Sequence, residues 1–166
     1  MMKRAFVAVA LLLAGAAAGL ALHVLTSPGD SVFSWKRPAS LGVKDGRLAR
    51  CRPTPNCVSS HADPGDAEHY VAPIAFRGPP LAAMAAARKA VESLPGATVV
   101  RHEENYLYAE FRSRWMRFVD DVEFTHDAAA SALHVRSASR LGRRDFGVNR
   151  GRVERLRALV EGRVRA

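Results

Sequence analysis

Three stretches in the second half of the chain alternate apolar and polar residues, the pattern of strands that bury one face. In residues 106–115, positions 107, 109, 111 and 115 share one apolar face. Residues 117–126 alternate in the same way, and a third stretch around residues 132–136 follows a polar turn. The pattern predicts an antiparallel meander, to which a strand near residues 98–102 adds a fourth member.

One register satisfies all three strands if Arg114 pairs with Arg117 at the first turn. The polar residues then fall on a face that we expect to be exposed, with Arg112 diagonal to Asp121. Across the strands, this register aligns Glu110 with Asp121 and Arg136, Glu123 with His134, and, on the core face, Asp120 with Ser137.

Helices are predicted before and after this meander. Pro79-Pro80 open the first, Pro95-Gly96 end it, and its apolar face comprises Leu81, Met84, Val91 and Leu94. The second begins near Asn149, the expected N-cap, with an apolar stripe of Val153, Leu156, Leu159 and Val160. With a short strand expected within residues 71–76, the order predicts an α+β two-layer sandwich of about four antiparallel strands and two helices.

The N-terminus predicts export. Lys3 and Arg4 precede an uncharged run over residues 5–25, which would form a helix of about 31 Å, enough to span a hydrocarbon core of roughly 30 Å. Since the basic flank belongs on the cytoplasmic side, the remainder is expected outside. Residues 1–26 are a signal anchor or a cleaved signal peptide, and the poor processing site near residue 26 favours the anchor. Residues 27–40 are predicted to be a tether and residues 41–166 a single domain.

Cys51 and Cys57 are the two cysteines of the chain. In an exported protein an even number of cysteines favours a disulfide. The alternative is a metal site, but two thiolates with His61 nearby make an incomplete ligand set for zinc. We therefore predict a disulfide and no metal.

The net charge of +9 is concentrated near the C-terminus, where residues 136–166 hold ten Arg and three acidic residues. Such a stretch indicates attraction to phosphate-rich surfaces, or else an ordinary solvated basic helix. Nucleic acid is not expected as a partner because the predicted compartment lacks it.

Three places could carry chemistry. The polar sheet face is either a lattice of salt bridges or a groove in which Arg112, Arg136, His134 and two tyrosines hold an anionic or sugar-like ligand. Asp120, on the core face, is either a structural ion-pair partner or an acid–base group, with Ser137, Ser139, Asn149 and Arg150 as its neighbours. The Gly- and Arg-rich residues 136–150 are similar to an anion cradle, although they match no nucleotide-binding motif.

The motifs at residues 55–60, 118–124 and 136–154 resemble the domain-of-unknown-function 1499 family of bacteria, over about residues 41–159. The resemblance implies one intact domain and no reaction. The N-terminal segment predicts that this domain lies on the periplasmic side of a bacterial inner membrane, and we expect no cofactor. The motif positions of the family are Asp120, Asp121, Glu123, Arg136, Ser137, Ser139, Arg140, Asp145, Asn149 and Arg150.

The leading functional prediction is a membrane-anchored envelope module that binds an anionic ligand, a lipid headgroup or a partner protein. A hydrolase that uses Asp120 or Asp121 is one alternative. A structural or assembly factor without a small ligand is another.

Overall fold

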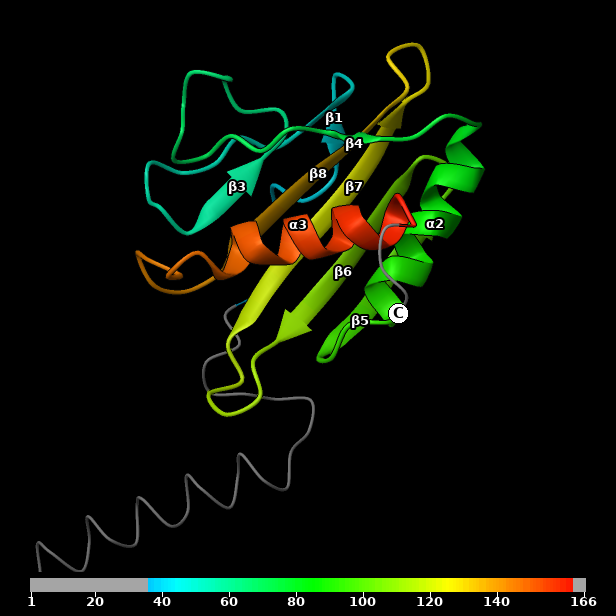
Figure 1. Cartoon of the computed structure of the whole chain (residues 1–166). Helices are drawn as coiled ribbons and strands as arrows, with labels where there is room; N and C mark the ends of the chain where they lie inside the picture. Colours follow the sequence, from blue (N-terminus) through cyan, green and yellow to red (C-terminus); the bar gives the residue numbers. More distant parts are fainter. Residues whose placement is uncertain (1–35, 163–166) are drawn as a thin grey trace, which may run out of the picture.

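The computed structural model describes residues 36–162. Its elements, in chain order, are β1 (Val43–Lys44), β2 (Arg47–Leu48), β3 (Cys57–Ser59), β4 (Ile74–Ala75), α2 (Pro80–Glu92), β5 (Ala97–Glu103), β6 (Tyr106–Arg112), β7 (Val119–Asp127), β8 (Ala132–Ser139) and α3 (Val148–Val160) (Figure 1). Within this part of the chain no helix is long and apolar enough to cross a membrane. The helix predicted over residues 5–25 lies outside the described residues.

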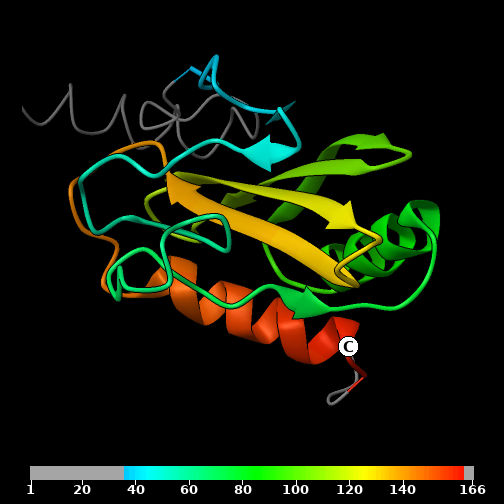
Figure 2. The same cartoon turned by 90° about the horizontal axis from the view of Figure 1, so that it is seen from above.

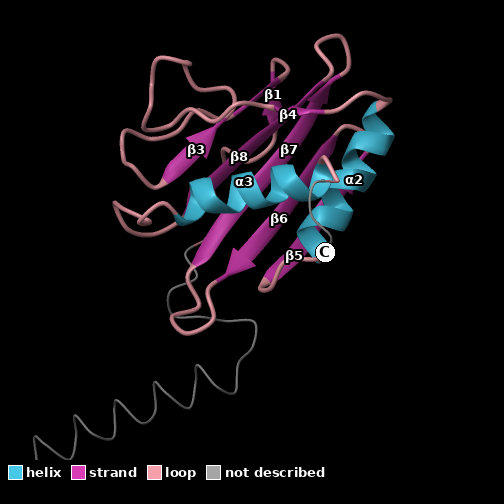
Figure 3. Ribbon diagram, viewed as in Figure 1, coloured by secondary structure: helices cyan, strands magenta, loops and turns pink. Residues whose placement is uncertain are grey.

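Two helices pack on one face of a six-stranded antiparallel sheet, so the predicted α+β two-layer fold is confirmed (Figure 3). The strand order is β3-β8-β7-β6-β5, and β4 also pairs with β8. The core between the layers joins Leu107 and Phe111 of β6 to Met84 of α2 and Leu156 of α3. Strand β4 lies within the short strand expected over residues 71–76. Strand β3 was not predicted, because three residues are too few to show a period.

The predicted register is correct for the first pair of strands and wrong for the second. Glu110 pairs with Asp121 as expected. In the next pair, Glu123 lies opposite Arg136 instead of His134, and Asp120 opposite Ser139 instead of Ser137. The prediction was shifted by two residues, which leaves every side chain on its own face. The apolar pattern therefore cannot detect the error.

Two details of the helices differ from expectation. Leu81 is 61% exposed, and the buried face of α2 uses Ala83 and Ala87 beside Met84. Gly147, in a left-handed conformation, is the N-cap of α3 in place of Asn149. The Asp145 carboxylate accepts hydrogen bonds from the backbone N–H groups of Gly147 and Asn149, which frees the Asn149 side chain for contacts with the sheet.

The sheet face opposite the helices is covered, although its polar residues predicted an exposed face. The chain from residue 36 through β1 and β2 lies over it, and Figure 2 shows this segment and α3 on opposite sides of the sheet. Leu48 packs on Tyr106 and Tyr108, and all three are at most 5% exposed. Most of the charged side chains that β6, β7 and β8 carry on this face are therefore buried as well.

Candidate functional site

A network of buried charges occupies the covered sheet face. Glu110 of β6 and Asp121 of β7 share Arg140, which directly follows β8. The Nη2 of Arg140 donates to Glu110 Oε1 and to Asp121 Oδ1 at 2.6 Å each, and its Nε donates to both Asp121 oxygens at 3.0 Å. Buried carboxylates require such charge-assisted partners. Arg140 is thereby fixed in one orientation.

Glu123 binds the neighbouring arginine. Its Oε2 accepts a hydrogen bond from Arg136 Nη1 at 3.0 Å. Its Oε1 accepts from the Tyr106 hydroxyl at 2.8 Å and from the backbone N–H of Gly42 at 2.7 Å. Glu123 therefore fixes Arg136. It also binds the segment from residue 36 through β2, which we call the covering segment, to the sheet.

Glu110 has two further guanidinium partners. Arg37 Nε donates to its Oε1 at 2.7 Å and Arg112 Nη2 to its Oε2 at 3.0 Å. Burial by itself would raise the pKa of Glu110, but the hydrogen bonds from Arg140 and Arg37 outweigh it and hold the pKa at about 2. Glu110 is therefore ionised at any physiological pH.

The two tyrosines of the network remain neutral hydrogen-bond donors. Burial raises the pKa of both Tyr106 and Tyr108, and the adjacent carboxylates of Glu123 and Asp121 raise them further. The Tyr108 hydroxyl donates to Asp121 at 2.6 Å. Neither tyrosine is placed to act as a base.

This network forms part of the floor of a pocket of about 380 Å³ at the end of β8. Arg136 and Arg140 lie on the floor, and more exposed cations surround them: Lys36, Arg37, Arg50 and Arg52. Asp121 is the one carboxylate among the described residues that line this pocket, and Arg140 already binds it. We call this cavity the arginine pocket.

Three cations of the arginine pocket have no acidic partner within residues 36–162. Lys36 and Arg50 form no hydrogen bond or ion pair there, and Arg52 makes only a 3.5 Å contact with the Ser139 carbonyl. On the floor, Arg136 is 7% exposed, yet its buried Nε lacks a hydrogen-bond partner in the described chain. A buried donor without an acceptor costs about 1–3 kcal/mol.

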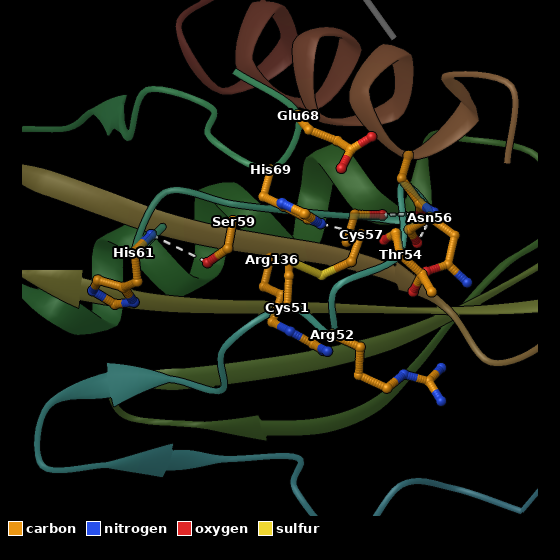
Figure 4. The surroundings of a disulfide bond; sticks show 12 residues. Cys51, Arg52, Thr54, Asn56, Cys57, Ser59, His61, Glu68, His69 and Arg136 are labelled. Atoms are coloured by element: carbon orange, nitrogen blue, oxygen red, sulfur yellow. Dashed lines mark hydrogen bonds between the residues drawn. A yellow bond between two sulfur atoms is a disulfide. The ribbon is translucent and has the colours of Figure 1, made fainter. Parts of the chain in front are cut away.

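The predicted disulfide joins Cys51 to Cys57 and positions two of the cations. Figure 4 shows Arg52 and Arg136 beside this bond. The disulfide loop is fixed at its far end by Asn56, whose side-chain amide donates to the Gly142 carbonyl at 2.7 Å. The cross-link thus holds Arg50 and Arg52 next to β8.

Asp120 lies apart from the arginine pocket, under α3. It accepts a hydrogen bond from Arg152 Nη2 at 2.6 Å, whereas the sequence suggested Arg150 as its cationic neighbour. Arg152 Nη1 also donates to Ser137 and to Asn149, so one arginine connects the sheet to the helix. This geometry is that of a structural ion pair.

Asn149 is the other link between α3 and the sheet. Its side chain is fully buried and accepts a hydrogen bond from the Ser137 hydroxyl at 2.6 Å. Its amide donates to Ser139 Oγ and to the Asn56 carbonyl. Asn149, Ser137 and Ser139 therefore place the helix on the sheet.

Arg150 also has a structural contact, because its guanidinium donates to backbone carbonyls of the loop before β4. The acceptors are Tyr70 at 2.8 Å, Ala67 at 3.0 Å and Glu68 at 3.1 Å. Arg157, two helical turns further along α3, binds the carbonyls of Ala72 and Pro73. Much of the basic charge of α3 thus serves to bind this loop.

His134 does not line the arginine pocket. It stacks on His61, with ring centroids 3.9 Å apart, and its Nδ1 lies 3.1 Å from the Ser60 hydroxyl. Burial and the neighbouring His134 lower the pKa of His61 to about 4, and burial lowers that of His134. Within residues 36–162, no cluster of three or more His, Cys, Asp or Glu side chains could hold a metal ion.

The arginine pocket therefore brings together only part of the predicted set, namely Asp121, Arg136, Ser139 and Arg140, with Arg112 and Glu123 bonded into the network beneath it. Sequence analysis missed Lys36, Arg37, Arg50 and Arg52. The available signal was the pair of arginines that flank Cys51, since a disulfide fixes the residues next to it.

The fold and pocket define a class: a two-layer α+β domain with a buried arginine–carboxylate network under a cationic pocket. The model of the family described as "Protein of unknown function (DUF1499)" matches residues 47–160. The match covers more than half of the chain, which therefore belongs to this family, as the three motifs indicated. No curated protein and no solved structure matches the chain.

Proposed function

We propose that this protein is a membrane-anchored envelope module that binds a small anionic ligand, of the phosphate or carboxylate class, in the arginine pocket. The observation that carries the proposal is the composition of the pocket. Six cationic side chains line it, and three of them, Lys36, Arg50 and Arg52, have no acidic partner within residues 36–162, while the one carboxylate is already bonded. A bound anion would compensate this excess of positive charge.

The buried floor supports a specific site over a diffuse basic surface. Arg136 and Arg140 are pinned by carboxylates beneath them, so they do not need to be ordered when a ligand arrives. The unpartnered Nε of Arg136 adds a buried donor beside this floor. The pocket volume of about 380 Å³ lies within the range typical of small-molecule sites.

The test is an isothermal calorimetric titration of the detergent-solubilised full chain with inorganic phosphate. Replacing Arg50 and Arg52 by alanine removes two exposed rim cations and leaves the buried network intact. We expect the double substitution to weaken phosphate binding by about tenfold or more, since a charge-assisted hydrogen bond contributes roughly 1.5–3 kcal/mol.

Arg77→Ala with Lys89→Ala is the matched control, because it removes two exposed cations outside the pocket. A second titration, with phosphatidylglycerol in nanodiscs, distinguishes a lipid headgroup from a free anion as the source of the ligand. Equal phosphate affinity for the two double variants and the parent would contradict the proposal.

The hydrolase hypothesis gains no support from the geometry. Asp120 is occupied by Arg152, and Asp121 by Arg140 and Tyr108. No nucleophile within residues 36–162 is hydrogen-bonded to either carboxylate in a way that would activate it. We therefore do not propose a reaction.

A further inference from the structure

Exposed apolar side chains gather at one end of the sheet. The described residues have seven exposed large hydrophobic side chains, and five belong to two neighbouring connections. Trp115, Met116 and Phe118 lie in the β6–β7 turn, and Phe146 and Val148 at the start of α3. Trp115 is 80% exposed and Phe146 is 95% exposed. A group of exposed large apolar side chains is uncommon on a soluble surface and marks an interaction site.

The two connections leave the same end of the sheet. The backbone N–H of Arg140, just after β8, donates to the carbonyl of Val119, where β7 begins. Arg114 and Val148, one from each connection, line one groove of about 940 Å³. In Figure 1 both connections lie toward the lower left, and the β7–β8 turn lies at the opposite end of the sheet. We call residues 113–118 and 141–148 the apolar tip.

The apolar tip is also basic. Residues 113–118 contain two arginines and no acid, and residues 141–148 contain two arginines and one aspartate. At the opposite end, the turns of residues 104–105 and 128–131 contain Glu104, no basic residue and no large apolar side chain. These two turns therefore have neither the basic nor the apolar character of the apolar tip.

Backbone conformation adds an independent observation. Phe146 adopts a φ of 55°, in the left-handed region that a bulky residue rarely occupies. Its side chain is almost completely exposed to solvent. A residue that is both strained and exposed has no stabilising role within the domain, and such positions cluster at functional sites.

The start of the described chain lies at the same end of the sheet. Lys36 lines the arginine pocket together with Ser139 and Arg140, at the end of β8. The ten residues from 26 to 35 separate it from the apolar segment predicted to cross the membrane, and ten residues reach at most about 35 Å. The anchor would thus hold this end of the sheet close to the bilayer.

We propose that the apolar tip docks on the headgroup layer of an anionic bilayer, with Trp115 and Phe146 at the interface and the surrounding arginines on lipid phosphates. Tryptophan favours this depth, and basic clusters are attracted to anionic lipid. The proposal rests on the membrane anchor in the proposed function, and it does not depend on a ligand in the arginine pocket.

The test uses the full chain with Trp35→Phe, which leaves Trp115 as its single tryptophan. The protein is reconstituted into phosphatidylcholine–phosphatidylglycerol vesicles with bromine on the upper acyl chain, a contact quencher of tryptophan fluorescence. We expect quenching of about half or more of the Trp115 emission. The matched control carries Trp35→Phe, Trp115→Phe and Ala129→Trp, which moves the probe to the opposite end and should remain unquenched.

Each other outcome overturns the inference. Unquenched Trp115 in protein that floats with the vesicles would refute docking and leave the anchor standing, whereas protein that fails to float would refute both. Quenching that persists when Arg114 and Arg144 are both replaced by glutamate would refute the role of charge. A dimeric mass with Trp115 shielded in detergent would assign the apolar tip to a second copy of the chain.

Discussion

At the scale of single residues, the charged side chains under the covering segment perform two tasks. Glu110, Asp121 and Glu123 compensate buried arginines, and they also fix the guanidinium groups at the pocket floor. A buried ion pair is weak support for stability, because desolvation offsets much of its attraction. The pairs here serve instead to preorganise a cationic floor.

Replacement of Arg140 tests this network most directly. Arg140→Ala would leave Glu110 and Asp121 buried with an uncompensated charge, and we expect the free energy of unfolding to fall by about 3–5 kcal/mol. Arg88→Ala is the control, since Arg88 pairs with Glu92 on the exposed face of α2 and should contribute less than about 1 kcal/mol. Urea unfolding of the detergent-solubilised chain, followed by near-UV circular dichroism, measures both. Equal losses would mean that the network is not the source.

The stacked pair of His61 and His134 predicts a loss of stability in mild acid. The backbone N–H of Leu48 donates to His61 Nδ1, so the folded ring is neutral with its proton on Nε2. The pKa of His61 falls from 6.5 to about 4 on folding, so the unfolded chain binds the proton more readily between these values. Stability from this ring is thus complete above pH 6.5 and declines as the pH falls toward 4.

We expect this decline to amount to about 1–2 kcal/mol, after allowance for the partial exposure of the ring. In His61→Asn the side-chain oxygen can still accept the Leu48 N–H, but no proton is bound. Its stability should therefore vary less across this pH range than that of the parent, as thermal unfolding at a series of pH values would show. Parallel curves for the two proteins would contradict the assignment.

At the scale of elements, α3 shows how few contacts place a helix on this sheet. Asn149→Ala would remove the donor to Asn56 and Ser139 and leave the Ser137 hydroxyl with one partner fewer. We expect a loss of about 1–3 kcal/mol, because these groups are buried.

Gly151→Ala, one half-turn further along the helix, should have the opposite effect. A Cβ there meets no atom within 4 Å, and the backbone is helical, so alanine should stabilise α3 by about 0.5–1 kcal/mol. Thermal unfolding of the two variants beside the parent measures both signs. A destabilising Gly151→Ala would show that α3 is not a regular helix at this position.

The elements that were predictable from the sequence are those with a long apolar pattern. Strands β5 to β8 and both helices follow from period 2 or helical spacing, and the β6–β7 register follows from a short turn. The β7–β8 register does not, because a shift of two residues preserves both faces. Nor does the burial of Glu110, Asp121 and Glu123, since charged residues on a strand normally indicate solvent and only the covering segment reverses this.

For the same reason, the arginine pocket was only half predictable. Asp121, Arg136 and Arg140 stand out within the family motifs, but Arg37, Arg50 and Arg52 come from a region without a period. A long loop that returns to cover a sheet has no local signature, because its contacts are all distant in sequence. Here the disulfide brings Arg50 and Arg52 to the pocket, and Asn56 ties its loop to Gly142.

At the scale of the whole molecule, the two proposed surfaces lie at the same end of the sheet. Arg140 lines the arginine pocket, and the second segment of the apolar tip, residues 141–148, begins at the next residue of the chain. If the anchor holds this end near the bilayer, the pocket opens close to the headgroup layer. A ligand presented at the membrane surface would then reach it without a large movement of the domain.

The proposed envelope module would lie outside the cytoplasm, and the disulfide allows a direct test of this location in living cells. Disulfides persist in oxidising compartments and are rare where thiols are kept reduced. The full chain should therefore contain no free thiol when cells are quenched with acid and treated with a maleimide polymer. After reduction, both Cys51 and Cys57 should react and shift the protein on a gel.

A variant without residues 5–25 should behave differently, since it lacks the apolar segment that is predicted to direct export. We expect its cysteines to react without prior reduction, because the domain then remains in a reducing compartment. Cys51→Ser in the full chain calibrates the shift produced by one thiol. Free thiols in the full chain would place the domain in the cytoplasm. Membrane docking of the apolar tip from the periplasmic side would then be excluded, while anion binding in the arginine pocket would remain testable on its own.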